Sequence, residues 1–352
     1  MGGGEHRASR PRVPKSARSP AETSLVECPP GDDRPVDVAP APIPSARKPL
    51  RSESKMDFVK MHGAGNDYVY ADTFAGPLPT DLPRAELARR VAHRRFGVGG
   101  DGLILIEPSD VADCRMEMYN ADGSRAEMCG NGIRCVAKYV HDHGLCPSDK
   151  LAVETDCGVL NIEVHLRSGV AVAATVDMGV PQFDPRSVPT TFGDHEPVVD
   201  HWAKFDGNEF QITCVSMGNP HCVIFVPKIT DELVLGLGPK IENDPRFPSR
   251  TNVEFVEILS RHEVRQRTWE RGSGETWACG TGASAVCAAG VRTGRTEPTI
   301  NNHLLGGDLT LQYRDDRIFM TGPAATVCRG TLDASLLSDA SVGSKSLEAA
   351  VR

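Results

Sequence analysis

The stretch "AEMCGNGIRCVAKYV" (residues 126–140) places a cysteine directly before a Gly-x-Gly turn and a helix-like run, and "WACGTGASAVCAAGV" (residues 277–291) does so again. In the first run, apolar residues recur three, four and seven positions after Ile133, a pattern that predicts a helix with one buried face. The second run is small or apolar on every side, as expected of a helix enclosed by a sheet. The sequence therefore predicts two helices, each beginning directly after a cysteine, Cys129 and Cys279.

A helix that begins at such a turn has useful chemistry at its first residues. The first N–H groups have no intrahelical partner, and the aligned peptide dipoles leave about half a positive charge there. This end of a helix lowers the pKa of a thiol and binds an anion, such as a carboxylate, through backbone donors. Gly130 and Gly132, like Gly280 and Gly282, permit a close approach that a β-carbon would obstruct. We therefore expect a reactive thiol and an anion site at each helix start.

The repetition itself indicates an internal duplication. The two cysteines lie 150 residues apart, and "MHGAGND" (61–67) in the first half is echoed by "MGNPH" (217–221) in the second. Two related halves would each present one helix start to a shared cleft. Two opposed acid/base thiols with a carboxylate held between them suit inversion of the carbon next to that carboxylate. One thiolate would remove the proton, and the opposite thiol would deliver another to the other face.

The rest of the chain is richer in strands than in helices. A helix is predicted over residues 84–95, with Leu87 and Val91 on one face. Alternation and β-branched residues predict strands at 103–107, 151–155, 159–166, 170–178, 221–226, 252–259 and 309–313. This balance favours an α+β or mixed-sheet protein over a doubly wound one.

Composition excludes several classes of function. The 352 residues carry a net charge of −8, so there is no basic surface for nucleic acid or an anionic membrane. No apolar stretch approaches the roughly 20 residues of a membrane span. Eleven cysteines form an odd number in a chain too large to need disulfides, which favours free thiols in a reducing cytoplasm.

Residues 1–55 differ from the remainder. Ten of the 26 prolines fall there, with almost no aromatic or periodic apolar content. Such a segment cannot bury enough surface to offset its ordering entropy, so we expect a disordered tail. Met56 then opens a strand-like alternation, "MDFVKMHGAGNDYVYAD", and we interpret Met56 as the true translational start.

Six blocks along the chain together resemble a known family. They are "FVKMHGAGNDY", "GVGGDGLILIE", "NADGSRAEMCGNGIRC", "VSMGNPHCV", "RTNVEFVEI" and "ERGSGETWACGTGASA". In this order they are similar to the successive signatures of diaminopimelate epimerases, and the similarity covers about residues 56–330. The resemblance implies interconversion of LL- and meso-2,6-diaminopimelate without a cofactor, in the synthesis of lysine and peptidoglycan precursors.

The resemblance also implies an architecture. It implies two pseudo-symmetric α+β domains, each a mixed, β-barrel-like sheet around a central helix, with the active site between them. The N-terminal half would span 56–173, with 323–336 returning to it, and the C-terminal half 174–322, followed by a tail over 337–352. A homodimer and no bound metal are implied as well.

The site residues follow from the same blocks. Cys129 and Cys279 would be the two acid/base groups. The helix-start amides that hold the reacting carboxylate would come from Gly130, Asn131, Gly280 and Thr281. The remaining substrate contacts would be Asn66, Asn120, Asn219, Asn252, Glu270 and Arg271, and His221 would line the cleft. One departure is Gly102, where some members of the family place a glutamine contact.

The second charged end of diaminopimelate explains part of this set. Its distal carboxylate needs a bidentate clamp such as Arg271, and its amine needs acceptors such as Glu270. Proline and hydroxyproline epimerases, the nearest alternative, bind a cyclic imino acid without that second end, so the Glu270–Arg271 pair argues against them. Pyridoxal phosphate is not expected, because two thiols make an electron sink unnecessary.

A more distant alternative is a thiol-based redox or metal-binding module. No short Cys-x-x-Cys or paired-histidine spacing supports a zinc site, and "HDH" (141–143) is interpreted as a solvated helix end. The other cysteines are expected to be small buried hydrophobic residues: Cys114, Cys135, Cys157, Cys214, Cys222, Cys287 and Cys328.

Overall fold

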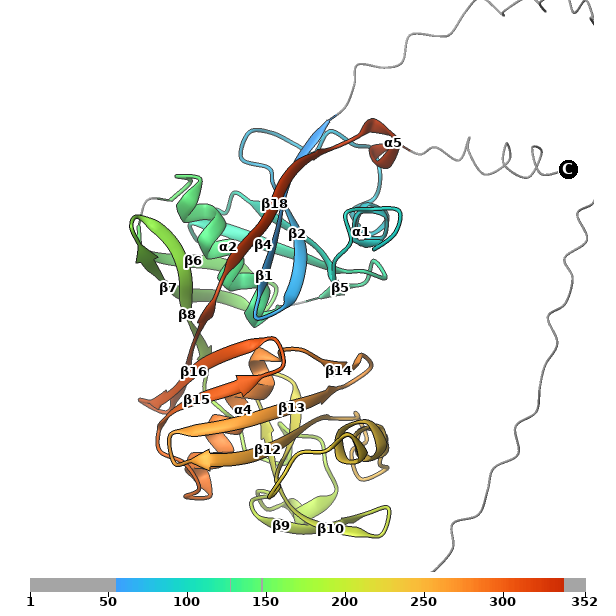
Figure 1. Cartoon of the computed structure of the whole chain (residues 1–352), viewed down its shortest axis with the longest axis vertical. Coiled ribbons are helices and arrows are strands. Elements are labelled where there is room, and N and C mark those ends of the chain that lie inside the picture. The colour runs from blue at the N-terminus through green and yellow to red at the C-terminus, as the bar shows by residue number, and fades with distance from the viewer. Residues whose placement is uncertain (1–54, 127, 147, 339–352) are drawn as a thin grey trace, which may run out of the picture. The chain divides into compact units, whose positions relative to one another are not determined.

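The computed structural model describes residues 55–126, 128–146 and 148–338 (Figure 1). Residues 1–54 of the predicted tail over 1–55, and all but the start of the one over 337–352, lie outside these ranges. Within them, no helix is both long and apolar enough to cross a membrane.

Eighteen strands and few helices make up the described chain, which confirms the predicted α+β class. The first eight strands are β1 (Met56–Gly63), β2 (Asn66–Asp72), β3 (Gly102–Glu107), β4 (Cys114–Asn120), β5 (Arg125–Ala126), β6 (Lys150–Thr155), β7 (Gly158–Arg167) and β8 (Val170–Gly179). The others are β9 (His201–Phe205), β10 (Asn208–Ser216), β11 (Pro220–Phe225), β12 (Asn252–Ser260), β13 (Glu263–Glu270), β14 (Gly274–Thr276), β15 (Thr299–Leu304), β16 (Gly307–Arg314), β17 (Arg317–Pro323) and β18 (Ala325–Leu332). The helices are α1 (Arg84–Ala92), α2 (Gly130–Asp142), α3 (Gly238–Glu242), α4 (Gly280–Arg292) and α5 (Ala334–Leu337), with a 3-10 turn at Phe192–His195 and a π-helical turn at Glu232–Leu237.

The strand pairings repeat, which establishes the internal duplication. In the first half, β1 pairs antiparallel with β2, β2 parallel with β3, β3 antiparallel with β4 and β4 parallel with β6. The strands β10, β11, β12, β13 and β15 pair in the same order and with the same directions. Two antiparallel pairings follow in each half. They are β6 with β7 and β7 with β8 in the first half, and β15 with β16 and β16 with β17 in the second. The two halves therefore correspond strand for strand, β1–β8 to β10–β17.

The halves are joined by strands. β8 pairs with β7 on one side and with β17 of the other half on the other, so it continues through the predicted boundary at residues 173/174. After β17 the chain returns to the first half, where β18 pairs along β1 (Figure 1). The strands of both halves thus belong to one continuous hydrogen-bonded sheet.

The two cysteine-led helices occupy equivalent places in this sheet. α2 contacts β1, β7 and β8, and α4 contacts the corresponding β10, β16 and β17. Every residue of α4 from Ala283 to Gly290 is buried, as the sequence predicts. The prediction of a single buried face for α2 is wrong, because residues 130–140 are all buried. The cationic Lys138 is accommodated there because its Nζ donates to Asp142 and to the carbonyl of Ala171.

Candidate active site

Both predicted helix starts are present, and in each the cysteine is the N-cap. The Cys129 sulfur accepts a hydrogen bond from the N–H of Gly132 at 3.4 Å. The Cys279 sulfur accepts one from the N–H of Gly282 at 3.3 Å. These sulfurs occupy the position where a serine or aspartate oxygen usually caps a helix.

The two helix starts meet each other. A β-carbon on Gly280 would lie 3.5 Å from the Cα of Gly130, and one on Gly130 would lie 3.7 Å from the Cα of Gly280. The Asn131 side chain crosses the junction and donates to the carbonyl of Ala278 at 2.9 Å. Glycine suits both positions, because a β-carbon would lie 3.0 Å from the Met320 side chain at Gly130 and 3.2 Å from it at Gly280. One cysteine from each half therefore lies next to this contact.

A fully buried guanidinium stabilises the junction. Arg134 donates to the carbonyl of Gly130, to the Asn131 side-chain oxygen and to the carbonyl of Pro323, at 2.9, 2.8 and 3.3 Å. Burial lowers the pKa of Arg134. The positive charge of this side chain acts to lower the pKa of the neighbouring Cys129 thiol.

The expectation that helix starts lower the thiol pKa values is not met in this arrangement. Burial raises the pKa of Cys129, although the N–H groups of Gly132 and Asn131 act against it. Burial raises the pKa of Cys279 well above its ordinary value, and the carboxylates of Glu270 and Glu254 act in the same direction. The physical reason is that the closed, water-poor junction removes more solvation from a thiolate than the helix amides return.

The surroundings of Cys129 come from β2 and the loop before β3. The Cys129 thiol donates to Asn66 Oδ1 at 3.4 Å, and the Asn66 amide nitrogen donates to Asp101 at 2.8 Å. Asp101 also accepts from the backbone N–H of Asp67, which fixes the turn. Burial, together with the neighbouring Cys129 and Asp101, raises the pKa of Tyr68 far above its usual range.

The surroundings of Cys279 are more polar. Thr281 Oγ1 lies 3.5 Å from the Cys279 sulfur and 3.3 Å from the Asn219 amide nitrogen. The fully buried His221 contacts the Asn219 oxygen at 2.9 Å and Glu254 at 2.8 Å. His221 therefore reaches the site through Asn219.

Glu270, the last residue of β13, influences both thiols. Its carboxylate raises the pKa of Cys129 and of Cys279. Burial raises the pKa of Glu270 itself, while hydrogen bonds from Thr276 and the Cys279 thiol oppose that rise. The thiols of both halves thus share one electrostatic environment.

The side chains of three further predicted residues, Asn252, Arg271 and Asn120, form hydrogen bonds with other parts of the protein. Asn252 donates to the carbonyl of Pro220 and accepts from the backbone N–H of Arg271, so it holds the backbone that carries Arg271. The Arg271 guanidinium is exposed and donates to the carbonyl of Ser249. Asn120 donates to Ser124 at the end of β4, opposite Gly102.

The departure at Gly102 has a steric cause. A β-carbon there would lie 2.0 Å from the carbonyl oxygen of Tyr119 and 2.9 Å from the Tyr68 ring. Because the first of these atoms is backbone in the paired strand β4, no side chain fits without separating β3 from β4. A glutamine, which the resemblance implies for some members at this position, does not fit the backbone of this chain.

Replacing Gly102 with alanine is therefore expected to lower the free energy of unfolding by about 3 kcal/mol. Gly236→Ala provides the control, because a β-carbon on the exposed Gly236 meets nothing within 4 Å and its backbone is not left-handed. Urea denaturation of the two variants measures the difference. Equal stabilities would show that β3 and β4 can separate at low cost.

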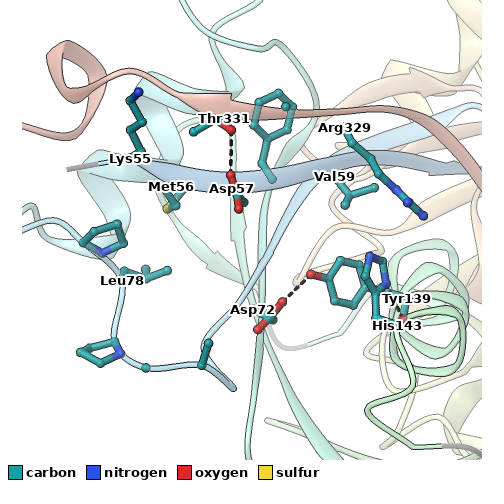
Figure 2. A pocket seen from close by; sticks show the side chains of 16 residues that line it. Lys55, Met56, Asp57, Val59, Asp72, Leu78, Tyr139, His143, Arg329 and Thr331 are labelled. Carbon is teal, nitrogen blue, oxygen red and sulfur yellow. Dashed lines mark hydrogen bonds between the residues drawn. The ribbon is translucent and has the colours of Figure 1, made fainter. Parts of the chain in front are cut away.

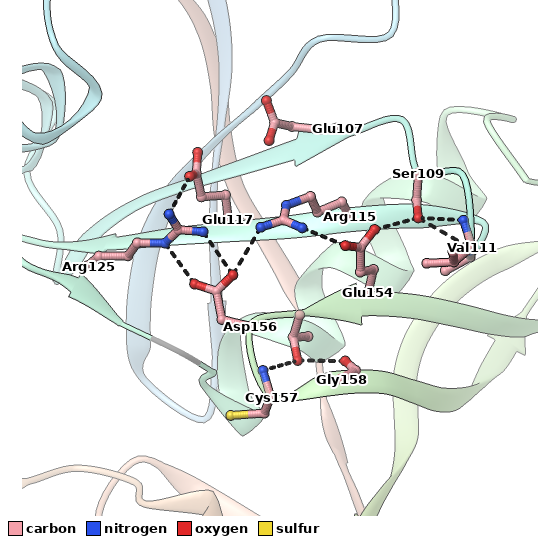
Figure 3. Close-up of polar contacts among 12 residues, drawn as sticks. Glu107, Ser109, Val111, Arg115, Glu117, Arg125, Glu154, Asp156, Cys157 and Gly158 are labelled. Atoms are coloured by element: carbon pink, nitrogen blue, oxygen red, sulfur yellow. Dashed lines mark hydrogen bonds and ion pairs between the residues drawn. The ribbon is translucent and has the colours of Figure 1, made fainter.

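An ion-pair network supports the segment that leads into Cys129 (Figure 3). Arg125 of β5 binds both oxygens of Asp156 at 2.7 and 2.8 Å, and Arg115 of β4 binds Asp156 and Glu154. The short strand β5 is thus tied to β4 and to the turn after β6. This fixes the chain shortly before the cap of α2.

Two predictions about the other cysteines are wrong. Cys157 is exposed, because it lies in the turn between β6 and β7 rather than within a strand (Figure 3). Cys328 is exposed because it lies in β18, which pairs along β1 and whose residues 326–329 are all exposed. The remaining five are buried as predicted: Cys114, Cys135, Cys214, Cys222 and Cys287.

An open groove of about 740 Å³ lies elsewhere in the first half (Figure 2). It is bordered by β1, β18, the loop after β2 and the end of α2, where Tyr139 donates to Asp72. Neither thiol lines it. Within the described ranges no group of three or more His, Cys, Asp or Glu side chains is arranged to hold a metal ion.

Sequence reasoning missed three residues of the site. Tyr68 lies in "FVKMHGAGNDY" and Asp101 in "GVGGDGLILIE", but an aromatic and an acidic residue beside a glycine turn give no separate signal. Glu254 carries a clearer signal. It is a charged residue in the middle of the apolar strand β12, where its neighbours Val253 and Phe255 are fully buried.

Comparison with known proteins agrees with this geometry. A family model described as diaminopimelate epimerase matches residues 58–183 and 213–327. A diaminopimelate epimerase of Moorella thermoacetica is 50% identical over 277 residues, which cover 78% of this chain and 98% of the relative. One of Desulfitobacterium hafniense is 49% identical over 279 residues, covering 79% and 98%. The crystal structure of a hydroxyproline epimerase from Agrobacterium vitis shares the fold, with a TM-score of 0.58 and 18% identity over 81% of this chain and 92% of that one. The chain belongs to the diaminopimelate epimerase family.

Proposed function

We propose that Cys129 and Cys279 are the two acid/base groups with which this isomerase epimerises 2,6-diaminopimelate, a reaction of lysine biosynthesis. The observation that carries the proposal is the contact between Gly130 and Gly280, which brings two cysteine-capped helix starts to one point. A carboxylate bound by both helix starts would place its α-carbon between the thiols. One thiolate then removes the α-proton, and the other thiol protonates the opposite face.

The remaining roles fit the two ends of the substrate. Backbone amides of Gly130, Asn131, Gly280 and Thr281 would hold the reacting carboxylate. Asn66, Asn120, Asn219, Asn252 and Glu270 would contact the substrate or orient the groups that do. The exposed Arg271 guanidinium would clamp the distal carboxylate after a small movement from Ser249.

We further propose that the reaction needs no cofactor, because two thiols suffice for proton removal and return. We propose a cytoplasmic homodimer with no nucleic-acid partner. The cysteine content supports a reducing compartment and the net charge of −8 argues against nucleic acid. Exposed valines on β8 and β18, Val170 and Val327, would be covered in a dimer. Sedimentation analysis tests the oligomeric state.

The function is tested with the purified full-length chain. It should convert LL-diaminopimelate to meso-diaminopimelate without added cofactor and with a metal chelator present, and it should not racemise proline or hydroxyproline. Turnover of either cyclic imino acid in preference to diaminopimelate would overturn the substrate assignment.

Glu270→Gln is expected to lower the pH midpoints for alkylation of both thiols by iodoacetamide. The sign follows because the Glu270 carboxylate raises the pKa of Cys129 and of Cys279, so its neutral replacement makes both thiolates easier to form. Peptide mass mapping across a pH series measures each midpoint. A shift at only one cysteine would show that Glu270 is not shared between them.

A further inference from the structure

The two halves place different side chains under their helix starts. β3 and β12 correspond, and their registers against β4 and β13 place Glu254 at the position equivalent to Ile104. A β-carbon on Gly132 would lie 2.7 Å from Ile104 Cδ1, and one on Gly282 would lie 2.7 Å from Glu254 Oε1. Because the first half fills this place with an apolar side chain, the fold itself does not require a carboxylate there.

Glu254 begins a chain of hydrogen bonds that ends at a thiol. Its Oε1 lies 2.8 Å from Nδ1 of His221, whose Nε2 lies 2.9 Å from Oδ1 of Asn219. The Asn219 amide nitrogen lies 3.3 Å from Thr281 Oγ1, which lies 3.5 Å from the Cys279 sulfur. Each member except the terminal ones thus has one partner on either side.

We propose that Glu254 is a positioning residue that sets the direction of this chain, so that the Thr281 hydroxyl donates to the Cys279 thiolate. Glu254 is fully buried, and its Oε2 has no hydrogen-bond partner among the described residues. The atoms that face the two ring nitrogens of His221 are both acceptor oxygens, Glu254 Oε1 and Asn219 Oδ1, so the hydrogen bonds are satisfied when the ring carries a donor proton on each nitrogen.

The direction follows from that protonation. A ring that donates from both nitrogens requires the Asn219 oxygen to accept, which turns the Asn219 amide nitrogen towards Thr281. The Thr281 oxygen then accepts, and its hydrogen is left for the Cys279 sulfur. With a neutral ring that accepts at Nε2, the Asn219 amide would turn over, Thr281 would donate to Asn219, and the thiolate would lose this donor.

The first half has a different and shorter chain, in which Asn66 donates to Asp101 and accepts from the Cys129 thiol. Its residue equivalent to His221 is Tyr68, which pairs with Gly102 as His221 pairs with Asn252. There the Cys129 thiol itself donates to Asn66. The Cys279 thiol likewise donates to Glu270, so the feature that distinguishes Cys279 is the Thr281 hydroxyl beside its sulfur.

A simple electrostatic role for Glu254 predicts the opposite effect of its removal. The ionisable groups that face Cys279 are Glu270 from β13, Glu254 from β12 and, through Asn219, His221 from β11. The negative charge of Glu254 by itself raises the pKa of Cys279. Loss of that charge alone would therefore ease thiolate formation, whereas loss of the directed chain would hinder it.

The test is Glu254→Gln in the full-length, substrate-free protein, with iodoacetamide alkylation of each cysteine followed across pH by peptide mass mapping. The expected result is a rise of about one pH unit in the Cys279 midpoint with the Cys129 midpoint unchanged, and a fall in kcat of about tenfold or more with little change in KM. Asp244→Asn is the matched control, because Asp244 is a partly buried carboxylate of the same half that pairs with Arg246 away from both thiols, and it should move neither midpoint. An unchanged or lowered Cys279 midpoint in Glu254→Gln would overturn the proposal.

A second pair of variants keeps the proposal testable if Glu254→Gln does not fold. Thr281→Val removes the last hydroxyl of the chain, and Thr281→Ser retains it. The valine variant should raise the Cys279 midpoint and the serine variant should not, and equal midpoints would overturn the proposal. The proposal rests on the two-base function, but these midpoints are measured without substrate. Failure of the wild-type protein to invert diaminopimelate would therefore be a separate result.

Discussion

Replacing Cys279 with alanine is expected to lower kcat for the inversion of LL-diaminopimelate by about 10⁴-fold or more, and Cys129→Ala should do the same. Each variant retains one base but has nothing to deliver a proton to the opposite face. The helix starts should still form, because the glycine amides and the packing of α2 and α4 do not depend on the thiols. Circular dichroism and a coupled assay for meso-diaminopimelate measure fold and activity. Inversion at near the wild-type rate by either variant would contradict the two-base assignment.

Matched controls lie in the same two helices. Cys135 in α2 and Cys287 in α4 are fully buried and lie six and eight positions beyond the caps. Neither sulfur caps a helix at the junction of the two helix starts, so neither is expected to reach the α-carbon of the substrate. Their alanine variants should lose about 1 kcal/mol of stability and keep most of the activity.

Mild oxidation is expected to abolish activity through a disulfide between Cys129 and Cys279, and dithiothreitol should restore it. The close approach of Gly130 and Gly280 brings the two preceding residues near each other, and disulfides form when the Cα atoms come within about 5.5–6 Å. Bound substrate should protect, because its α-carbon would lie between the sulfurs. Peptide mapping of the oxidised protein identifies the linkage.

The rate of that oxidation should depend on pH. Thiolates are the reactive species, and burial raises the pKa of both thiols. Inactivation should therefore be slow near neutral pH and become faster as the pH rises. Inactivation without a peptide that links residues 129 and 279 would show that the two thiols do not share one site.

Much of the fold was predictable because its strongest signals are local. The glycine turns and the small-residue pattern of α4 predict a helix that is enclosed, and the predicted apolar strands correspond to β3, β6, β7, β8, β11, β12 and β16. Strands such as β13 ("EVRQRTWE") were missed because their outward faces carry long charged residues, which hide the buried Val264, Gln266 and Thr268. The full enclosure of α2 was also missed, because Lys138 is neutralised by a partner that only the tertiary structure provides.

The residues of the site were predictable from the sequence, but the hydrogen bonds that connect them were not. The ordered blocks predict where the asparagines and cysteines lie. They do not predict that the Asn252 side chain forms hydrogen bonds with backbone groups of Pro220 and Arg271. The thiol pKa values depend on solvent exclusion where the halves meet, which no local pattern encodes. Glu254 could have been suspected from its place in an apolar strand, but its link to Cys279 through Thr281 requires the three-dimensional arrangement.

The most direct test of the central claim follows the α-proton in deuterium oxide. At early conversion of LL-diaminopimelate, the account predicts that every meso product carries one deuterium at the inverted carbon, because the delivering thiol has exchanged with solvent. The recovered LL substrate should contain almost no deuterium, because the base returns only the proton it removed. Meso product that retains the substrate's own proton would contradict two opposed thiols and would indicate a single base acting on both faces.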